Sequence, residues 1–168
     1  MTASLSRRAL FGRLRGGGVQ LRPPWSRPES EFTDRCTQCG NCFGACPTGV
    51  LVHGHAGYPI VDFSKAQCTL CQACAAACND GCFDVRAGRA AWSIKAAIGE
   101  SCIETKGVAC RVCQDACETS AIRFRPQLGG RAAPAIYDDA CTGCGACVAV
   151  CPVGAISVGN NQSDRVSA

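Results

Sequence analysis

Four cysteines lie within a stretch of eleven residues, and a proline follows directly: Cys36, Cys39, Cys42, Cys46 and Pro47. This is the iron–sulfur spacing C-x2-C-x2-C-x3-C-P, in which three cysteines ligate one cubane and the fourth ligates a second cubane. One such run therefore predicts a partner run elsewhere in the chain. The fold must bring the two runs together, which constrains it more than any other feature of the sequence.

Three further runs are present. The second has the same spacing, with Asn79 in place of the proline, and consists of Cys68, Cys71, Cys74 and Cys78. The last keeps both the spacing and the proline, Pro152, and consists of Cys141, Cys144, Cys147 and Cys151. The third is irregular, because seven residues separate Cys102 from Cys110, Cys113 and Cys117.

The crossover rule predicts which cysteines share a cluster. In the first half, the sets are Cys36, Cys39, Cys42 with Cys78, and Cys68, Cys71, Cys74 with Cys46. In the second half, they are Cys141, Cys144, Cys147 with Cys117, and Cys110, Cys113, Cys151 with Cys102. The long approach to Cys102 makes the last set the least regular, and without Cys102 it would be a labile three-cysteine site. We therefore expect three to four [4Fe-4S] clusters per chain.

Two other uses of cysteine compete with this interpretation. A disulfide scaffold needs an oxidising compartment, and 17 thiols cannot all pair. Structural zinc sites usually combine two C-x2-C pairs from separate segments, which leaves no role for a third and fourth cysteine in the same run. Both alternatives explain the spacing less well than iron–sulfur clusters do.

The runs also predict local structure. The third and fourth cysteines of a run are one helical turn apart, so a short helix can present both to neighbouring clusters. Gly40, Gly143 and Gly145 permit unusual backbone angles in the cysteine loops, and Pro47 ends the first short helix. Apolar segments follow at 50–52 and 155–158, which indicates short strands.

Because this plan repeats, the predicted class is α+β, with two tandem bacterial-type (2[4Fe-4S]) ferredoxin-like modules. The predicted organisation is a basic arm at 1–27, a first module at 28–83, a linker at 84–97, a second module at 98–160 and a tail at 161–168. We expect Trp92 of the linker to pack beneath the modules. The chain is 47% hydrophobic, but its 17 cysteines are part of that share, so the core should be thin and metal binding should supply folding free energy.

The first 27 residues are strongly basic. Six arginines precede the first acidic residue, Glu29: Arg7, Arg8, Arg13, Arg15, Arg22 and Arg27. Nucleic-acid binding would be an alternative use of this charge, but no basic surface interleaved with aromatic residues supports it. We expect no nucleic-acid partner. We expect the arm to dock an acidic partner or the acidic, cluster-bearing body of its own chain, or to remain a solvated tail.

Ser6-Arg7-Arg8 resembles the start of a twin-arginine export signal. The apolar region that should follow is replaced by arginines and by Gly16-Gly17-Gly18, and no A-x-A-like cleavage site is present. No run is long enough for a membrane helix. We therefore predict a cytoplasmic protein without an integral membrane segment.

Other candidate functional residues are few. Cys82 belongs to no set of four, and we expect it to be a small buried hydrophobe rather than a ligand. His53 and His55 flank Gly54 in a turn, where solvated loop histidines are expected. The chain has no dinucleotide-binding turn, no P-loop and no nucleophile paired with a base, so we expect no catalytic residues and no enzyme activity of its own.

Several stretches together closely resemble the NapF family of ferredoxin-type accessory proteins of bacterial periplasmic nitrate reductase systems. They are Ser-Arg-Arg-Ala-Leu-Phe-Gly-Arg at 6–13, Leu-Arg-Pro-Pro-Trp-Ser at 21–26, Gly-Tyr-Pro at 57–59, Cys-Arg-Val-Cys-Gln-Asp-Ala-Cys at 110–117, and the four cysteine runs with the stretched third. The resemblance covers almost the whole chain.

The resemblance implies a cytoplasmic protein that interacts with the catalytic subunit NapA and assists its maturation before export. NapA is a molybdenum enzyme with its own 4Fe-4S cluster, and the assistance would be delivery of iron–sulfur units or of electrons to the NapA precursor. The alternative is an electron-transfer ferredoxin subunit that passes electrons to a redox enzyme. Reduction potentials, which depend on hydrogen bonds to sulfur, charge and exposure, would separate these roles.

Overall fold

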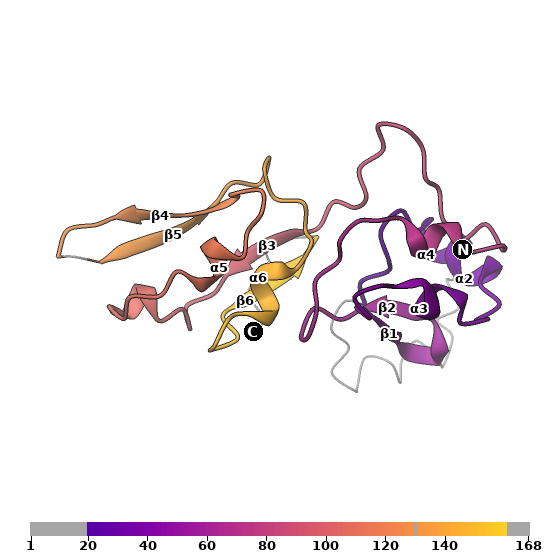
Figure 1. The fold of residues 1–168 in the computed structure, drawn as a ribbon, viewed down its shortest axis with the longest axis horizontal. Helices are drawn as coiled ribbons and strands as arrows, with labels where there is room; N and C mark the ends of the chain where they lie inside the picture. Colours follow the sequence, from indigo (N-terminus) through magenta and orange to yellow (C-terminus); the bar gives the residue numbers. More distant parts are fainter. Residues whose placement is uncertain (1–19, 130, 161–168) are drawn as a thin grey trace, which may run out of the picture.

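The computed structural model describes residues 20–129 and 131–160. Two small lobes lie side by side, and an extended segment after Phe83 connects them (Figure 1). We refer to residues 20–83 as the first lobe and to residues 95–160 as the second lobe. Most of the predicted basic arm, residues 1–19, and the predicted tail, residues 161–168, lie outside the described residues.

The first lobe has short helices around one hairpin. Its elements are α2 (Glu29–Arg35), α3 (Asn41–Ala45), β1 (Leu51–His53), the 3-10 turn η1 (His55–Gly57), β2 (Pro59–Val61) and α4 (Ala73–Ala76). Strands β1 and β2 pair antiparallel, with Leu51 opposite Val61. An isolated bridge between Ser26 and Phe83 joins the beginning and the end of the lobe.

The second lobe follows the same plan with longer strands. Its elements are β3 (Lys95–Ile98), η2 (Glu104–Lys106), α5 (Val112–Asp115), β4 (Ile122–Pro126), β5 (Ala132–Ile136), α6 (Ala146–Ala149) and β6 (Ile156–Gly159). Strands β4 and β5 form the middle hairpin, and β3 pairs antiparallel with β6, which joins the two ends of the lobe. The repeated short strands and helices confirm the expected mixed architecture.

Two segments outside the predicted modules pack against the lobes. Lys95, Ala96 and Ala97 lie in the predicted linker, and the structure pairs them with β6 as part of β3. Residues 20–27 belong to the predicted arm, and within them Trp25 is buried and its backbone forms hydrogen bonds with Ala91 and Asp84. Both segments pair with residues that are distant in the sequence, and a local sequence pattern cannot predict such pairing. The full module division remains a prediction.

Short helices with left-handed starts present the cysteines. The residue before α3, α4 and α6 has a positive φ, 82° at Gly40, 64° at Gln72 and 78° at Gly145. Helix α3 ends at Ala45, just before Cys46 and Pro47, as predicted. The third cysteine of each run lies inside its helix, and the fourth follows within two residues of the helix end. Each helix therefore directs two thiols toward different surroundings.

The apolar core is small and contains many of the cysteines. One cluster centres on Val50, Leu51, Val61, Phe63 and Ile94, and a second centres on Ala96, Ile122 and Ile156. Five cysteines are counted among the buried apolar residues: Cys74, Cys82, Cys102, Cys113 and Cys147. The largest fully buried side chain is Phe32, which packs edge-on against Phe83 with ring centroids 5.8 Å apart.

The lobes meet through specific contacts of their cysteine loops. The Cys68 amide donates to the carbonyl of Cys144 at 2.8 Å, and the Trp92 indole N–H donates to the carbonyl of Thr142 at 2.8 Å. Trp92 also packs edge-on against Phe63 with centroids 6.0 Å apart, as expected for a linker residue beneath the modules. None of the helices within 20–129 and 131–160 is long and apolar enough to span a membrane.

Gly145 is the position where this junction is tightest. A Cβ atom there would lie 2.0 Å from the Phe63 ring, and φ is +78°. Gly154 offers a matched control, because its φ is +60° and a Cβ would meet nothing within 4 Å. Both alanine variants should lose about 1–2 kcal/mol to left-handed strain, and only Gly145→Ala should lose about 1–3 kcal/mol more, through displacement of Phe63. Thermal unfolding under anaerobic conditions measures this, and equal shifts for the two variants would contradict the packing described.

Candidate metal centres

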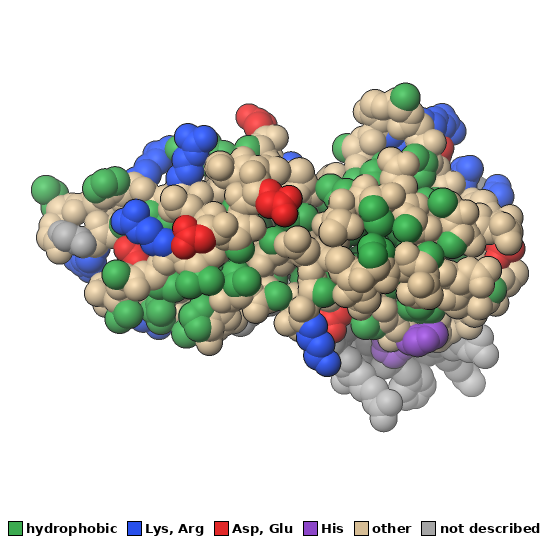
Figure 2. Space-filling model, viewed as in Figure 1, with side chains coloured by type: hydrophobic (Ala, Val, Ile, Leu, Met, Phe, Trp, Pro, Cys, Tyr) green, Lys and Arg blue, Asp and Glu red, His purple; other side chains and the backbone are tan. Residues whose placement is uncertain are grey.

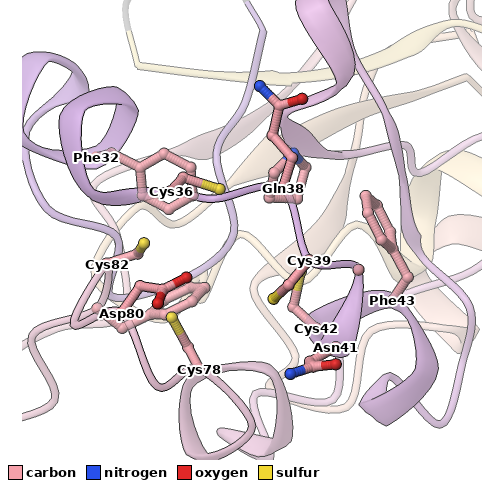
Figure 3. A pocket seen from close by; sticks show the side chains of 13 residues that line it. Phe32, Cys36, Gln38, Cys39, Asn41, Cys42, Phe43, Cys78, Asp80 and Cys82 are labelled. Carbon is pink, nitrogen blue, oxygen red and sulfur yellow. The ribbon is translucent and has the colours of Figure 1, made fainter.

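A cavity in the first lobe is lined by cysteines from both runs. Its volume is about 350 Å³, including space open to solvent, and Cys36, Cys39, Cys42, Cys78 and Cys82 line it. Figure 3 shows the sulfur atoms of these residues around a common space. Aromatic rings of Phe32, Phe43 and Phe83 complete the wall. Cys36, Cys39, Cys42 and Cys78, here called the first outer set, are thus brought together as the crossover rule predicts.

The second lobe contains an equivalent cavity of about 340 Å³. Four cysteines line it, Cys102, Cys110, Cys113 and Cys151, which we call the second outer set. Apolar side chains, among them Ile98, Phe124 and Ile156, form the rest of the wall. Cys102 therefore lies with the other three thiols despite its irregular spacing.

A buried carboxylate organises the long approach between Cys102 and Cys110. Glu104 is only 6% exposed, and it accepts a hydrogen bond from the backbone amide of Cys110. The Thr105 hydroxyl donates to the carbonyl of Cys102 at 2.6 Å. Sequence reasoning missed Glu104, and an acidic residue inside a stretched cysteine spacing is the signal that could have drawn attention to it.

The crossover rule assigns the remaining eight cysteines of the four runs to two further sets, and Cys68 and Cys144 place these sets at the lobe junction. The first inner set is Cys46, Cys68, Cys71 and Cys74, and the second inner set is Cys117, Cys141, Cys144 and Cys147. Cys68 interacts electrostatically with Cys46 and Cys71 and, across the junction, with Cys144. Cys147 interacts with Cys144 and Cys141 and also with Cys113 of the second outer set. Cys117 and Cys141 pack against the core cluster of the second lobe, which includes Cys147 and also Cys113. Each inner set again combines two runs.

Burial raises the pKa of several of these thiols. The pKa of Cys74 rises to about 12 through burial and the nearby thiol of Cys68. The pKa of Cys147 rises to about 12 through burial and Cys144, and that of Cys113 to about 11 through burial and Cys102. Without metal, these thiols hold their protons at neutral pH. A cationic metal centre would favour the thiolate, because it compensates the buried negative charge.

Cys46 and Cys117 occupy equivalent positions, since each is the fourth cysteine of the earlier run in its lobe. Hydrogen bonds to these two thiols lower their pKa. Burial would raise the pKa of Cys46, but the Thr48 hydroxyl, 3.6 Å from Sγ, and nearby backbone amides lower it overall. Thr119 and backbone amides lower the pKa of Cys117 in the same way. These donors stabilise a thiolate and would tune a metal centre bound there.

The donor sets fit a polynuclear centre. Across residues 20–129 and 131–160, no three His, Cys, Asp or Glu groups meet closely enough to bind one metal ion. The thiols of each outer set instead surround a cavity, and four thiols from two runs are the donor set that a [4Fe-4S] cubane takes. The all-sulfur donors also suit iron–sulfur chemistry better than sites for hard cations.

Cys82 and the two histidines were the sequence's other candidates. Cys82 is buried, as expected, at 2% exposure, but it also lines the first cavity, which sequence reasoning missed because no regular run includes it. His53 and His55 are exposed, as expected, but His53 is the last residue of strand β1 rather than a loop residue. The His53 ring lies tilted against Phe43, with centroids 4.1 Å apart.

Comparison with protein families supports this chemistry in both halves of the chain. The family described as "4Fe-4S dicluster domain" matches residues 35–83, and a second family with the same description matches residues 106–155. The [4Fe-4S] cofactor and the two tandem ferredoxin-type domains are therefore confirmed. Two matched domains by themselves support about two clusters, so the predicted three to four is the higher figure, and the full count stays a prediction.

Several curated proteins are similar along most of the chain. The ferredoxin-type protein NapF of Escherichia coli strain K12 is 45% identical over 94% of this chain and 96% of its own length. NapF of Haemophilus influenzae is 47% identical over 88% of this chain and 83% of its own length. The ferredoxin-type protein NapG of E. coli K12 is 32% identical over 82% and 68%, respectively. From this identity and coverage, the chain belongs to the NapF family of ferredoxin-type proteins.

Proposed function

We propose that the sixteen cysteines of the four runs hold four [4Fe-4S] clusters, one in each outer and inner set. The observation that carries this proposal is the pair of cavities, each lined by one complete crossover set. Residues 20–83 and 95–160 would then be two equivalent modules joined by residues 84–94. When bound, each cluster supplies one-electron chemistry, while the chain supplies the thiolates, the apolar walls and the hydrogen bonds to sulfur.

The proposed role is that of a cytoplasmic iron–sulfur accessory protein, not an enzyme, which interacts with the NapA precursor. It assists NapA maturation before export by delivering iron–sulfur units or electrons. Membership of the NapF family supports this role, since the relatives' names place them in the Nap system. Exposure of Cys39 and Cys71 also supports it, because a ligand at the surface lets a partner approach the bound centre.

A second candidate is an electron-transfer ferredoxin subunit. The observation in its favour is the 2.8 Å hydrogen bond from the Cys68 amide to the Cys144 carbonyl. Cys68 belongs to the first inner set and Cys144 to the second. A single hydrogen bond therefore connects a ligand of one inner cluster with a ligand of the other. A continuous series of four centres would let an electron cross the molecule.

Cluster count tests the ligand assignment. Cys102→Ala should lose about four iron atoms, one cubane, because the second outer set then has only three thiols. Ser101→Ala, a neighbouring change that removes no thiol, should keep all the iron. Iron and sulfide are quantified after anaerobic reconstitution. Zinc at two per chain with no charge-transfer absorption would contradict the proposal.

Cluster binding should also depend on pH. Cys74, Cys113 and Cys147 have raised pKa values, about 11 to 12, in the metal-free chain, so they are protonated at neutral pH and must release protons to bind iron. Affinity should therefore rise with pH, by about tenfold per unit for each proton released. Chelator competition at pH 6.5 and 8.5 measures the slope. Cluster retention that does not change with pH would show that the thiols are already ionised.

The accessory role is tested by an anaerobic pull-down with NapA precursor, followed by iron and sulfide quantitation on both proteins. Truncation should remove residues 2–19 only, because Arg22 and Arg27 have structural partners, Glu29 and the carbonyl of Gly81. Loss of Arg7, Arg8, Arg13 and Arg15 should leave cluster content unchanged but weaken association and reduce its salt dependence.

A full-length variant with glutamine at these four positions separates charge from chain length. It should behave as the truncated protein does. Equal affinities for the NapA precursor and equal salt dependence for all three proteins would show that the arm does not contribute to binding. No association at any salt concentration would favour the electron-transfer candidate.

A further inference from the structure

The first cavity contains one thiol more than a cubane needs. Cys36, Cys39, Cys42 and Cys78 already make a complete set, and Cys82 is the fifth cysteine of the lining. The Cys82 side chain is 2% exposed, and Figure 3 shows its sulfur near those of Cys36 and Cys78, on the same side of the cavity. A thiol that served only for packing would be expected among apolar side chains rather than among other thiols.

The backbone holds Cys82 in this place. The Arg27 amide donates to the carbonyl of Cys82 at 3.0 Å, and the Arg27 guanidinium donates to the carbonyl of Gly81 at 2.8 Å. Phe83 pairs with Ser26 and packs against Phe32. Both sides of Cys82 are thus anchored to the beginning of the lobe, so its direction is set by tertiary structure and is not an effect of a loose loop.

The second cavity lacks this feature. It has nearly the same volume and the same crossover arrangement, but its cysteines are only the four of its set. Cys151 is the residue equivalent to Cys78, since each is the fourth cysteine of the later run in its lobe. The chain therefore contains its own control, one outer site with a fifth thiol and one without.

We propose that Cys82 is a reserve ligand of the first outer site and can replace Cys78 on iron. This inference rests on the cluster-binding function proposed above. In the exchange, the Cys82 thiol gives its proton to solvent and its sulfur bonds to iron, while the Cys78–iron bond breaks and the Cys78 thiolate takes up a proton. No electron is gained or lost. A site that can exchange one ligand without losing iron is suited to delivering its cluster or to surviving damage to one cysteine.

Four variants test the proposal: Cys78→Ala, Cys82→Ala, the double variant Cys78→Ala/Cys82→Ala, and Cys151→Ala. Each is reconstituted anaerobically, and iron and sulfide per chain are measured. Electron paramagnetic resonance is recorded on the oxidised protein, in which three-iron centres give a signal, and on the reduced protein, in which four-iron centres give one. Cys82→Ala should keep the iron content of the wild type. Cys78→Ala should also keep it, with all centres of the four-iron type, because Cys82 takes the vacant place. The double variant and Cys151→Ala should each lose about four iron atoms, one cubane.

The results distinguish failure of the reserve-ligand proposal from failure of the proposed cluster-binding function. If Cys78→Ala loses as much iron as the double variant, gains a three-iron signal, or fails to fold while Cys151→Ala folds, Cys82 is not a reserve ligand. In those cases the wild type still holds its clusters, and the proposed function stands. If the wild-type chain itself binds no cluster at the first outer set, the proposed function fails as well.

Discussion

The constraint on which the structure depends is the crossover of cysteine runs. Each short helix places its third cysteine in one set and its fourth in another, so every set joins segments far apart in the chain. A metal centre bound by such a set would close two long loops at once, and its binding free energy would be folding free energy. This matters here because the apolar clusters are small, and Cys74 and Cys113 are themselves members of them.

The two lobes differ in the contacts that hold their first and last segments together. In the second lobe, β3 and β6 pair over four residues and tie the ends together. In the first lobe, the equivalent pairing is reduced to the bridge between Ser26 and Phe83, and the buried Phe32 of α2 with the buried Trp25 provides the missing support. Residues counted by sequence as the end of a basic arm are therefore part of the fold, and Arg22 lies over the rings of Phe32 and Tyr58.

Sequence spacing predicted which thiols line the two outer cavities, because the thiols of a run are fixed by a few backbone angles, while the ligand sets themselves stay a prediction. Gly40 and Gly145 have the positive φ that the loops require, and the strands after Pro47 and Pro152 begin where apolar residues resume. What the sequence could not predict depends on distant partners. Ala96 becomes strand because β6 lies beside it, Glu104 is informative only once its contact with the Cys110 amide is known, and Cys82 enters the first cavity because Arg27 holds its backbone.

The surroundings of the four sets also differ, and this bears on how a partner could use them. The inner sets meet at the Cys68–Cys144 hydrogen bond, which leaves Cys71 as their exposed member. The first outer set has aromatic walls and the exposed Cys39. The second outer set is flanked by exposed valines, Val112 at 45% and Val153 at 43%, on a lobe whose lower edge is largely hydrophobic in Figure 2.

An electron entering at one outer set would have to pass both inner sets to leave at the other, whereas cluster delivery needs only one outer set and a ligand that can be exchanged. If the proposed function and the reserve-ligand proposal both hold, the first lobe would be the end suited to cluster delivery.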